Sequence, residues 1–156
     1  MPRLALTALV ATLAVGLTAC GGASKLSHGE YQQKLNAIGK DANQQAAGAL
    51  GAVLGSKGDV TKIAPQLDQA AEAIGGYADE LDGLAPPDDA ADANEKLVEA
   101  FRAAEKVFHE MAAAAKAGDE QKERSLLEQA KTGDFATELR EAGRELTKAG
   151  YTLPNG

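Results

Sequence analysis

This chain of 156 residues has no tryptophan, three phenylalanines, three tyrosines, two histidines and a single cysteine. So few aromatic side chains argue against a platform on which sugars or nucleobases would stack. A single cysteine excludes an internal disulfide, and the paired Glu-x-x-His motifs of di-iron helix bundles do not occur. The sequence also lacks a glycine-flanked serine elbow, a phosphate-cradling loop and a His-Glu-x-x-His zinc motif. These absences leave no recognisable catalytic, cofactor or metal centre.

Basic residues are also in deficit, because 16 lysines and arginines face 23 aspartates and glutamates for a net charge of −7. Removal of an N-terminal signal containing Arg3 would make the net charge −8. Such a chain is repelled by nucleic acid and by anionic lipid surfaces. We therefore expect no nucleic-acid partner.

What the sequence does contain begins with an apolar N-terminal segment. Arg3 precedes an apolar run from Leu4 to Val15, and Leu17-Thr18-Ala19-Cys20 follows. The stretch from Leu4 to Ala19 is shorter than the roughly 20 residues of a membrane-spanning helix. Its positive start, apolar middle and small residues are typical of a secretory signal. The alternatives are an ordinary secretory signal near a free cysteine, or a short transmembrane anchor.

The sequence Leu17-Thr18-Ala19-Cys20 resembles the lipobox of bacterial lipoproteins. That resemblance implies cleavage between Ala19 and Cys20, and a diacylglyceryl group with acyl chains such as palmitate on the Cys20 thiol. Two acyl chains suffice for stable membrane attachment. We therefore expect a signal peptide at 1–19, the lipidated Cys20 and a short tether at 20–26, and a helical domain at 27–156. The expected location is the extracytoplasmic face of the cell membrane, within the cell envelope.

The rest of the chain has the periodicity of four amphipathic helices. Ser27 and Glu30 form a capping-box pattern at the start of the first helix. Asp59 is expected to cap the second, and Pro86-Pro87 to stop it. Apolar residues on these two helices are spaced mostly by three or four, as in four-helix bundles. They are Tyr31, Leu35, Ile38, Ala42, Ala46, Ala49 and Val53, then Ile63, Leu67, Ala70, Ile74, Tyr77, Leu81 and Leu84.

The third helix is expected to start at Asp88 or Asp89 and to end at Gly118, with Asp119 capping the fourth. The apolar stripe of the fourth helix changes phase across Thr132-Gly133-Asp134, which predicts a kink or a short break there. No segment has the alternation of a strand. The sequence therefore predicts an all-α fold, an antiparallel up-down-up-down four-helix bundle.

Four aromatic residues share the expected helix seams and could line a pocket between helices, with alanines opposite leaving room. They are Tyr31, Tyr77, Phe101 and Phe108. The alternative is that this stripe is simply core. Acidic residues from Asp79 to Asp92 suggest either a cation site or solvated helix caps, and the helix dipole favours the second interpretation. Asn94, at a seam position, is either partly exposed or a buried residue that sets helix register or binds a ligand.

The helical part is also similar to small, alanine-rich secreted or lipid-anchored proteins of actinobacteria. The resemblance depends on the lipobox, on residues 84–88 (LAPPD), on residues 116–119 (KAGD) and on Ala149-Gly150-Tyr151. It implies no particular activity. Our first hypothesis is a non-enzymatic interaction module with an envelope protein as a conceivable partner, in an undetermined oligomeric state. The alternative is a carrier or receptor for a small apolar or cationic ligand between the helices, and the third is an enzyme of an unrecognised type.

Overall fold

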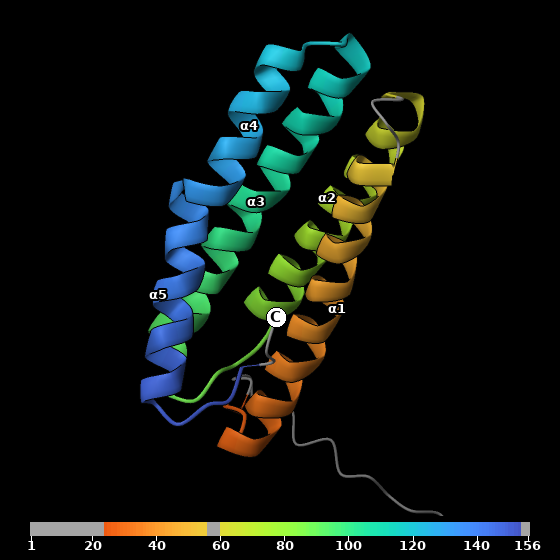
Figure 1. Ribbon diagram of the computed structural model, residues 1–156. Helices are drawn as coiled ribbons and strands as arrows, with labels where there is room; N and C mark the ends of the chain where they lie inside the picture. Colours follow the sequence, from red (N-terminus) through yellow and green to blue (C-terminus); the bar gives the residue numbers. More distant parts are fainter. Residues whose placement is uncertain (1–23, 56–59, 154–156) are drawn as a thin grey trace, which may run out of the picture.

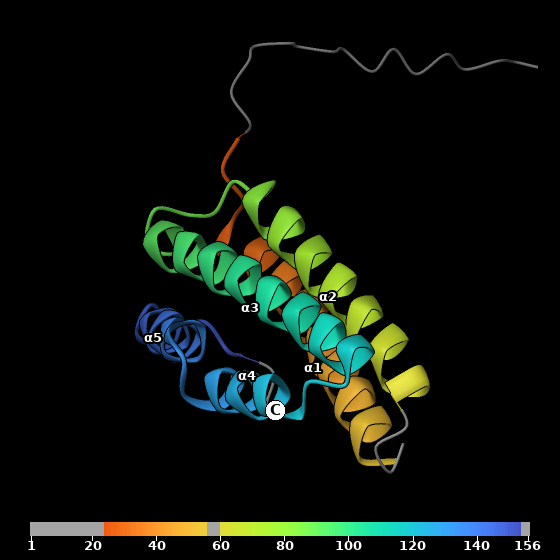
Figure 2. The ribbon, with the colours of Figure 1, turned by 90° about the horizontal axis from the view of Figure 1, so that it is seen from above.

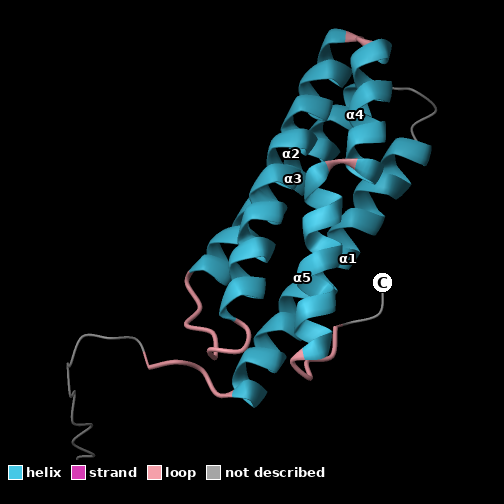
Figure 3. Ribbon diagram, turned by 90° about the vertical axis from the view of Figure 1, so that its left-hand side faces the viewer, coloured by secondary structure: helices cyan, strands magenta, loops and turns pink. Residues whose placement is uncertain are grey.

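The computed structural model describes residues 24–55 and 60–153, and every regular element within these ranges is a helix (Figure 1). The helices are α1 (His28–Gly55), α2 (Val60–Asp82), α3 (Ala91–Ala117), α4 (Glu120–Thr132) and α5 (Asp134–Lys148). Helices α4 and α5 follow one another along the same side of the molecule and together form its fourth rod (Figure 3). The predicted all-α four-helix bundle is confirmed.

The chain in Figure 1 climbs along α1, descends along α2, climbs along α3 and descends along α4 and α5. Ion pairs fix the relative direction of α2 and α3. Asp82 at the end of α2 pairs with Arg102 at 2.9 Å, and Asp68 near the start of α2 pairs with Lys116 near the end of α3 at 2.6 Å. These two helices therefore run in opposite directions.

Three of the predicted helix ends are formed by the predicted residues. The Ser27 backbone N–H and hydroxyl donate to Glu30 at 2.9 and 2.6 Å, which is the capping box at the start of α1. Gly118 ends α3 in the left-handed region at φ +67°, a conformation that favours glycine. The Asp119 carboxylate accepts from the Lys122 backbone N–H at 3.0 Å and caps α4. Asp59 lies outside the described residues.

The corner between α2 and α3 is longer than we expected. Helix α2 ends at Asp82, because the residue before Pro86 is disfavoured in the helical region and the chain must leave the helix earlier. Helix α3 starts at Ala91, so the expectation that Asp88 or Asp89 starts it was wrong. Both aspartates lie in a turn and contact other parts of the chain: Asp88 pairs with Lys25, and Asp89 accepts from the Tyr151 hydroxyl at 3.0 Å.

The predicted interruption of the fourth helix is a break at Gly133. A side chain on this residue would place its Cβ 2.4 Å from the carbonyl oxygen of Gln129, so only glycine fits. The Gly133 N–H donates to that same carbonyl at 2.8 Å and ends α4. The break lets the apolar stripe change phase and still face α3, which explains why Leu126 of α4 and Phe135 of α5 are both buried.

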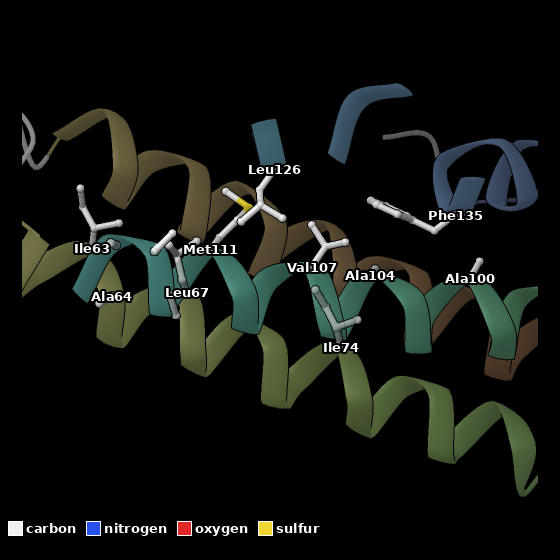
Figure 4. Packing of buried hydrophobic residues seen from close by; sticks show 13 residues of the cluster. Ile63, Ala64, Leu67, Ile74, Ala100, Ala104, Val107, Met111, Leu126 and Phe135 are labelled. Carbon is white, nitrogen blue, oxygen red and sulfur yellow. The ribbon is translucent and has the colours of Figure 1, made fainter. Parts of the chain in front are cut away.

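The core has two clusters of buried side chains. The first, here called the far cluster, extends from the start of α2 and the end of α3 toward the middle of the bundle, and Figure 4 shows Met111 and Leu126 pointing toward each other within it. Its buried members are Ile63, Ala64, Leu67, Ile74, Ala100, Ala104, Val107, Met111, Ala112, Ala114, Ala115, Leu126 and Phe135. The second, here called the tyrosine cluster, lies at the end of the bundle where α1 begins and α5 ends. Its buried members are Tyr31, Leu35, Ile38, Leu81, Ala90, Ala93, Leu97, Val98, Ala142, Leu146 and Tyr151.

The helices do not enclose the core equally on all sides. The backbones of α2 and α3 approach each other most extensively, α4 and α5 approach α3, and α1 approaches α2 (Figure 2). Among the described residues, the backbone of α1 does not come close to those of α3, α4 or α5. The bundle is therefore open between α1 and α5. Within residues 24–55 and 60–153, no helix combines the length and apolarity needed to cross a membrane.

Candidate ligand-binding groove

An apolar groove of about 350 Å³ occupies the open side of the bundle. Its size is at the lower end of the range usual for small-molecule sites, about 300–1,000 Å³. Helices α1, α2, α3 and α5 and the segment after α5 all contribute to it. The lining residues are Gly39, Ala42, Asn43, Ala46, Ile74, Leu97, Phe101, Ala104, Phe108, Phe135, Leu139, Gly143 and Leu153.

The groove exists because the side chains of α1 become small along the helix. Tyr31, Leu35 and Ile38 are at most 5% exposed and fill the space between the first turns of α1 and the neighbouring helices. The following positions on that face are Gly39, Ala42 and Ala46, whose side chains are too short to reach α5. Packed interiors leave few voids larger than a water molecule. A row of small residues opposite large ones therefore leaves a hollow along the middle of α1.

The opposite wall of the groove consists of large apolar side chains. Phe101 and Phe108 of α3 and Leu139 of α5 are only partly buried, and Phe135 is 8% exposed. Their uncovered surface faces an apolar space rather than a neighbouring helix. Asn43 is the only polar residue of the lining, and no acidic, basic, cysteine, serine or histidine side chain belongs to it among the described residues.

Hydrogen bonds link three helices within the tyrosine cluster. The Tyr31 hydroxyl donates to Asn94 Oδ1 at 2.9 Å, and Asn94 Nδ2 donates to the Leu81 carbonyl at 3.1 Å. Asn94 is 6% exposed, so the interpretation of a partly exposed residue was wrong. A buried amide that bonds α1 and α2 from α3 fixes the register of three helices.

Aromatic contacts hold the segment after α5 against the start of α1. The Tyr151 ring packs edge-on against Tyr31, with ring centroids 5.4 Å apart, and stacks on His28 at 4.0 Å. Burial raises the pKa of Tyr31. Burial, together with the hydrogen bond to the Asp89 carboxylate, raises the pKa of Tyr151 to about 12. Both phenols therefore stay neutral well beyond ordinary pH.

The last described residues, 151–153, cross from α5 to α1 (Figure 1) and are here called the strap. Gln32 of α1 donates to the Thr152 carbonyl and accepts from the Thr152 N–H, each at 2.6 Å. Leu153 lies against Gly143, whose missing side chain leaves room for it: a Cβ there would be 3.0 Å from Leu153 Cδ1. The strap thus connects α1 to α5 beside the groove, although their backbones stay apart.

Two of the four residues expected to form a pocket lie in this groove. Phe101 and Phe108 line it, whereas Tyr31 is buried in the tyrosine cluster. Tyr77 packs on Phe101, with ring centroids 6.3 Å apart, and is not among the lining residues. Sequence reasoning named none of the small residues of α1 as site residues. The signal was present as the run of glycine and alanine after Ile38.

Several exposed charged side chains, Asp79 and Asp82 of the acidic group among them, form surface ion pairs. Arg102 pairs with Asp82 and, at 4.0 Å, with Asp79. His109 Nδ1 lies 3.4 Å from the Asp68 carboxylate, and the hydrogen bond from Lys116 lowers the pKa of Asp68. Within the described ranges, no group of three histidine, cysteine, aspartate or glutamate side chains could hold a metal ion.

The expected tether is only partly described, because residues 1–23 lie outside the described ranges and Cys20 is among them. Its last residues dock onto the corner between α2 and α3. The Leu26 N–H donates to the Ala85 carbonyl at 2.7 Å, and the Leu26 side chain packs against the tyrosine cluster. The folded part thus begins before Ser27.

No family model, no curated protein and no solved structure matches this chain. The groove is therefore interpreted from its own geometry and chemistry.

Proposed function

We propose that this protein is a lipid-anchored, extracytoplasmic binding protein that holds a small apolar ligand in the groove between α1 and α5. The observation that carries the proposal is a hollow of about 350 Å³ whose lining is apolar except for Asn43 and in which Phe101, Phe108 and Leu139 leave apolar surface uncovered. Burying apolar surface contributes about 25 cal/mol per Å². The free energy of binding would gain this contribution from the apolar surface that the ligand and these side chains bury together.

One feature favours this function over an enzyme. The lining has no nucleophile, acid or base among the described residues, so the groove offers contact and shape rather than acid–base chemistry.

The groove can be tested with the uncharged apolar dye N-phenyl-1-naphthylamine and the substitution Ala46→Leu. The new side chain would enter the groove, and we expect dye affinity to fall at least about tenfold, the effect of 1.4 kcal/mol. Ala47→Leu is the matched control, because Ala47 is exposed and does not belong to the lining. Thermal unfolding by circular dichroism would show that both variants fold. If the dye does not bind, or binds both variants equally, the proposal fails.

The anchor needs a separate test, because it concerns Cys20 and not the groove. Cys20→Ala removes the thiol that would receive the lipid, so we expect an unprocessed precursor or a protein released from the membrane fraction. Fractionation of cells with immunoblotting distinguishes these outcomes from the wild type. A Cys20→Ala variant that is processed to the mature size and stays membrane-bound would overturn lipid anchoring.

A further inference from the structure

A stripe of three cationic side chains follows α5 along the edge of the groove. Arg140, Arg144 and Lys148 are exposed and spaced by four residues, which places them on one face of the helix. Together with Leu139, Gly143, Thr147 and Leu153 they line a second, shallow hollow of about 590 Å³. Leu139, Gly143 and Leu153 also line the groove. The cationic hollow and the apolar groove therefore adjoin.

The three cations of this stripe have no acidic partner among residues 24–55 and 60–153. None of them forms an ion pair with a residue in the described part of the chain, and Arg140 donates instead to the Thr137 hydroxyl at 3.1 Å. On α5 itself, Glu145 is bonded to Lys96 of α3 at 2.5 Å, and Glu141 also acts on Lys96. In a chain of net charge −7, this stripe beside an apolar groove is a place where an anionic group could bind without breaking an ion pair of the described residues.

We propose that the ligand is a free fatty acid, with its hydrocarbon chain in the groove and its carboxylate bound by Arg140, Arg144 and Lys148. This inference rests on the proposed function and names its ligand class. Arginine suits the carboxylate because its planar guanidinium donates two parallel hydrogen bonds. The same stripe would repel a cationic ligand, and the lining contains no carboxylate to attract one. The sequence also suggested a cationic ligand as an alternative to an apolar one. That alternative has no support in this groove.

A free fatty acid fits better than the surface of an anionic bilayer. The cations border a concave, apolar hollow, and a flat membrane surface would leave that hollow unfilled. The net negative charge of the whole chain also opposes adsorption to an anionic membrane. The groove volume of about 350 Å³ suits one hydrocarbon chain rather than the two chains of a phospholipid.

The decisive comparison uses two probes with the same hydrocarbon chain, palmitate and the uncharged hexadecanol. We expect the wild type to bind palmitate more tightly than hexadecanol, measured by displacement of N-phenyl-1-naphthylamine. In Arg140→Gln/Arg144→Gln, palmitate affinity should fall about tenfold while hexadecanol affinity stays within about twofold. Arg124→Gln/Lys131→Gln is the control, since it removes the same charge from α4 away from the groove.

Each outcome has a distinct meaning. Selective loss of palmitate binding, with weaker palmitate binding at high salt, supports the proposal. If hexadecanol binds the wild type as tightly as palmitate does, the carboxylate site is wrong while the apolar groove stands. If neither probe binds, both the ligand class and the proposed function fail. If Arg140→Gln/Arg144→Gln instead reduces co-sedimentation with phosphatidylglycerol vesicles and leaves palmitate affinity unchanged, the stripe is a membrane contact and the proposal is overturned.

Discussion

The two ends of the space between α1 and α5 differ in the side chains that α1 supplies. At the tyrosine cluster, Tyr31 is fully buried and bonded through Asn94 to two other helices. Along the groove, α1 offers Ala42 and Ala46 to the same neighbouring helices, and a hollow of about 350 Å³ remains. Helix periodicity continues through both regions. The difference teaches that periodicity determines which face of a helix turns inward, whereas side-chain volume determines whether the space is filled.

The largest expected difference compares two leucines on α5 that lie seven residues apart. Leu146 is fully buried in the tyrosine cluster, so Leu146→Ala should lower the free energy of unfolding by about 2–5 kcal/mol. Leu139 lies at the groove and is only partly buried, so Leu139→Ala should cost about 1 kcal/mol. Urea unfolding followed by circular dichroism measures both. Equal losses would mean that the groove is as tightly packed as the cluster.

Polar residues at the two ends provide the next comparison. Asn94→Ala leaves the Tyr31 hydroxyl without its buried partner, while the Leu81 carbonyl keeps the Leu84 N–H at 3.2 Å, and should cost about 1–3 kcal/mol. Asn43→Ala in the groove should change the free energy of unfolding by less than about 0.5 kcal/mol, because Asn43 is exposed. Tyr31→Phe combined with Asn94→Ala should cost less than the two changes added together. Additive costs would argue that the hydrogen bond contributes nothing.

Replacing an alanine by leucine should destabilise the protein in the tyrosine cluster but not in the groove. Ala142 is completely buried beside the tyrosine cluster, so Ala142→Leu should overpack it and cost about 1–3 kcal/mol. Ala46→Leu adds the same volume to the groove and should alter stability by less than about 0.5 kcal/mol. Thermal unfolding of the two variants gives the comparison. A strongly destabilised Ala46→Leu would show that no space is available there.

Alkaline pH should weaken the tyrosine cluster. The pKa of Tyr151 is raised from 10.0 to about 12, and that of Tyr31 is raised as well. The unfolded chain therefore loses these protons first, so stability is unaffected below pH 10 and falls as the pH rises from 10 toward 12. Unfolding free energies measured across this window should fall less steeply in Tyr151→Phe. The same slope in both proteins would contradict a buried, neutral Tyr151.

Local sequence patterns predicted the parts of this fold that depend on neighbours in the chain. The capping box of Ser27 and Glu30, the glycine at position 118 and the break at Gly133 all follow from short-range chemistry. The predicted start of α3 was wrong because Asp88 and Asp89 contact Lys25 and Tyr151, which are more than 60 residues away. Such contacts leave no mark in the local pattern.

The candidate site was predicted only in part for the same reason. Phe101 and Phe108 lie on α3 and line the groove. Tyr31 and Tyr77 share the same periodicity, yet Tyr31 is buried in the tyrosine cluster and Tyr77 packs on Phe101 outside the lining. The separation of two helices depends on every side chain between them. It therefore follows from the three-dimensional arrangement and not from the pattern of any single helix.

The attachment of α1 has a mechanical consequence. None of its described side chains belongs to the far cluster, whereas Tyr31, Leu35 and Ile38 belong to the tyrosine cluster and Gln32 bonds the strap. In the described part of the chain, the largest side chains that hold α1 therefore lie in its first half. Ala49 is also buried, at 6% exposed, whereas the stretch between Ile38 and Ala49 borders the groove. A bend within that stretch would widen or narrow the groove. Amide hydrogen exchange should accordingly be slowest from Tyr31 to Ile38, since the first amides of a helix lack acceptors within it, and faster from Gly39 to Ala46.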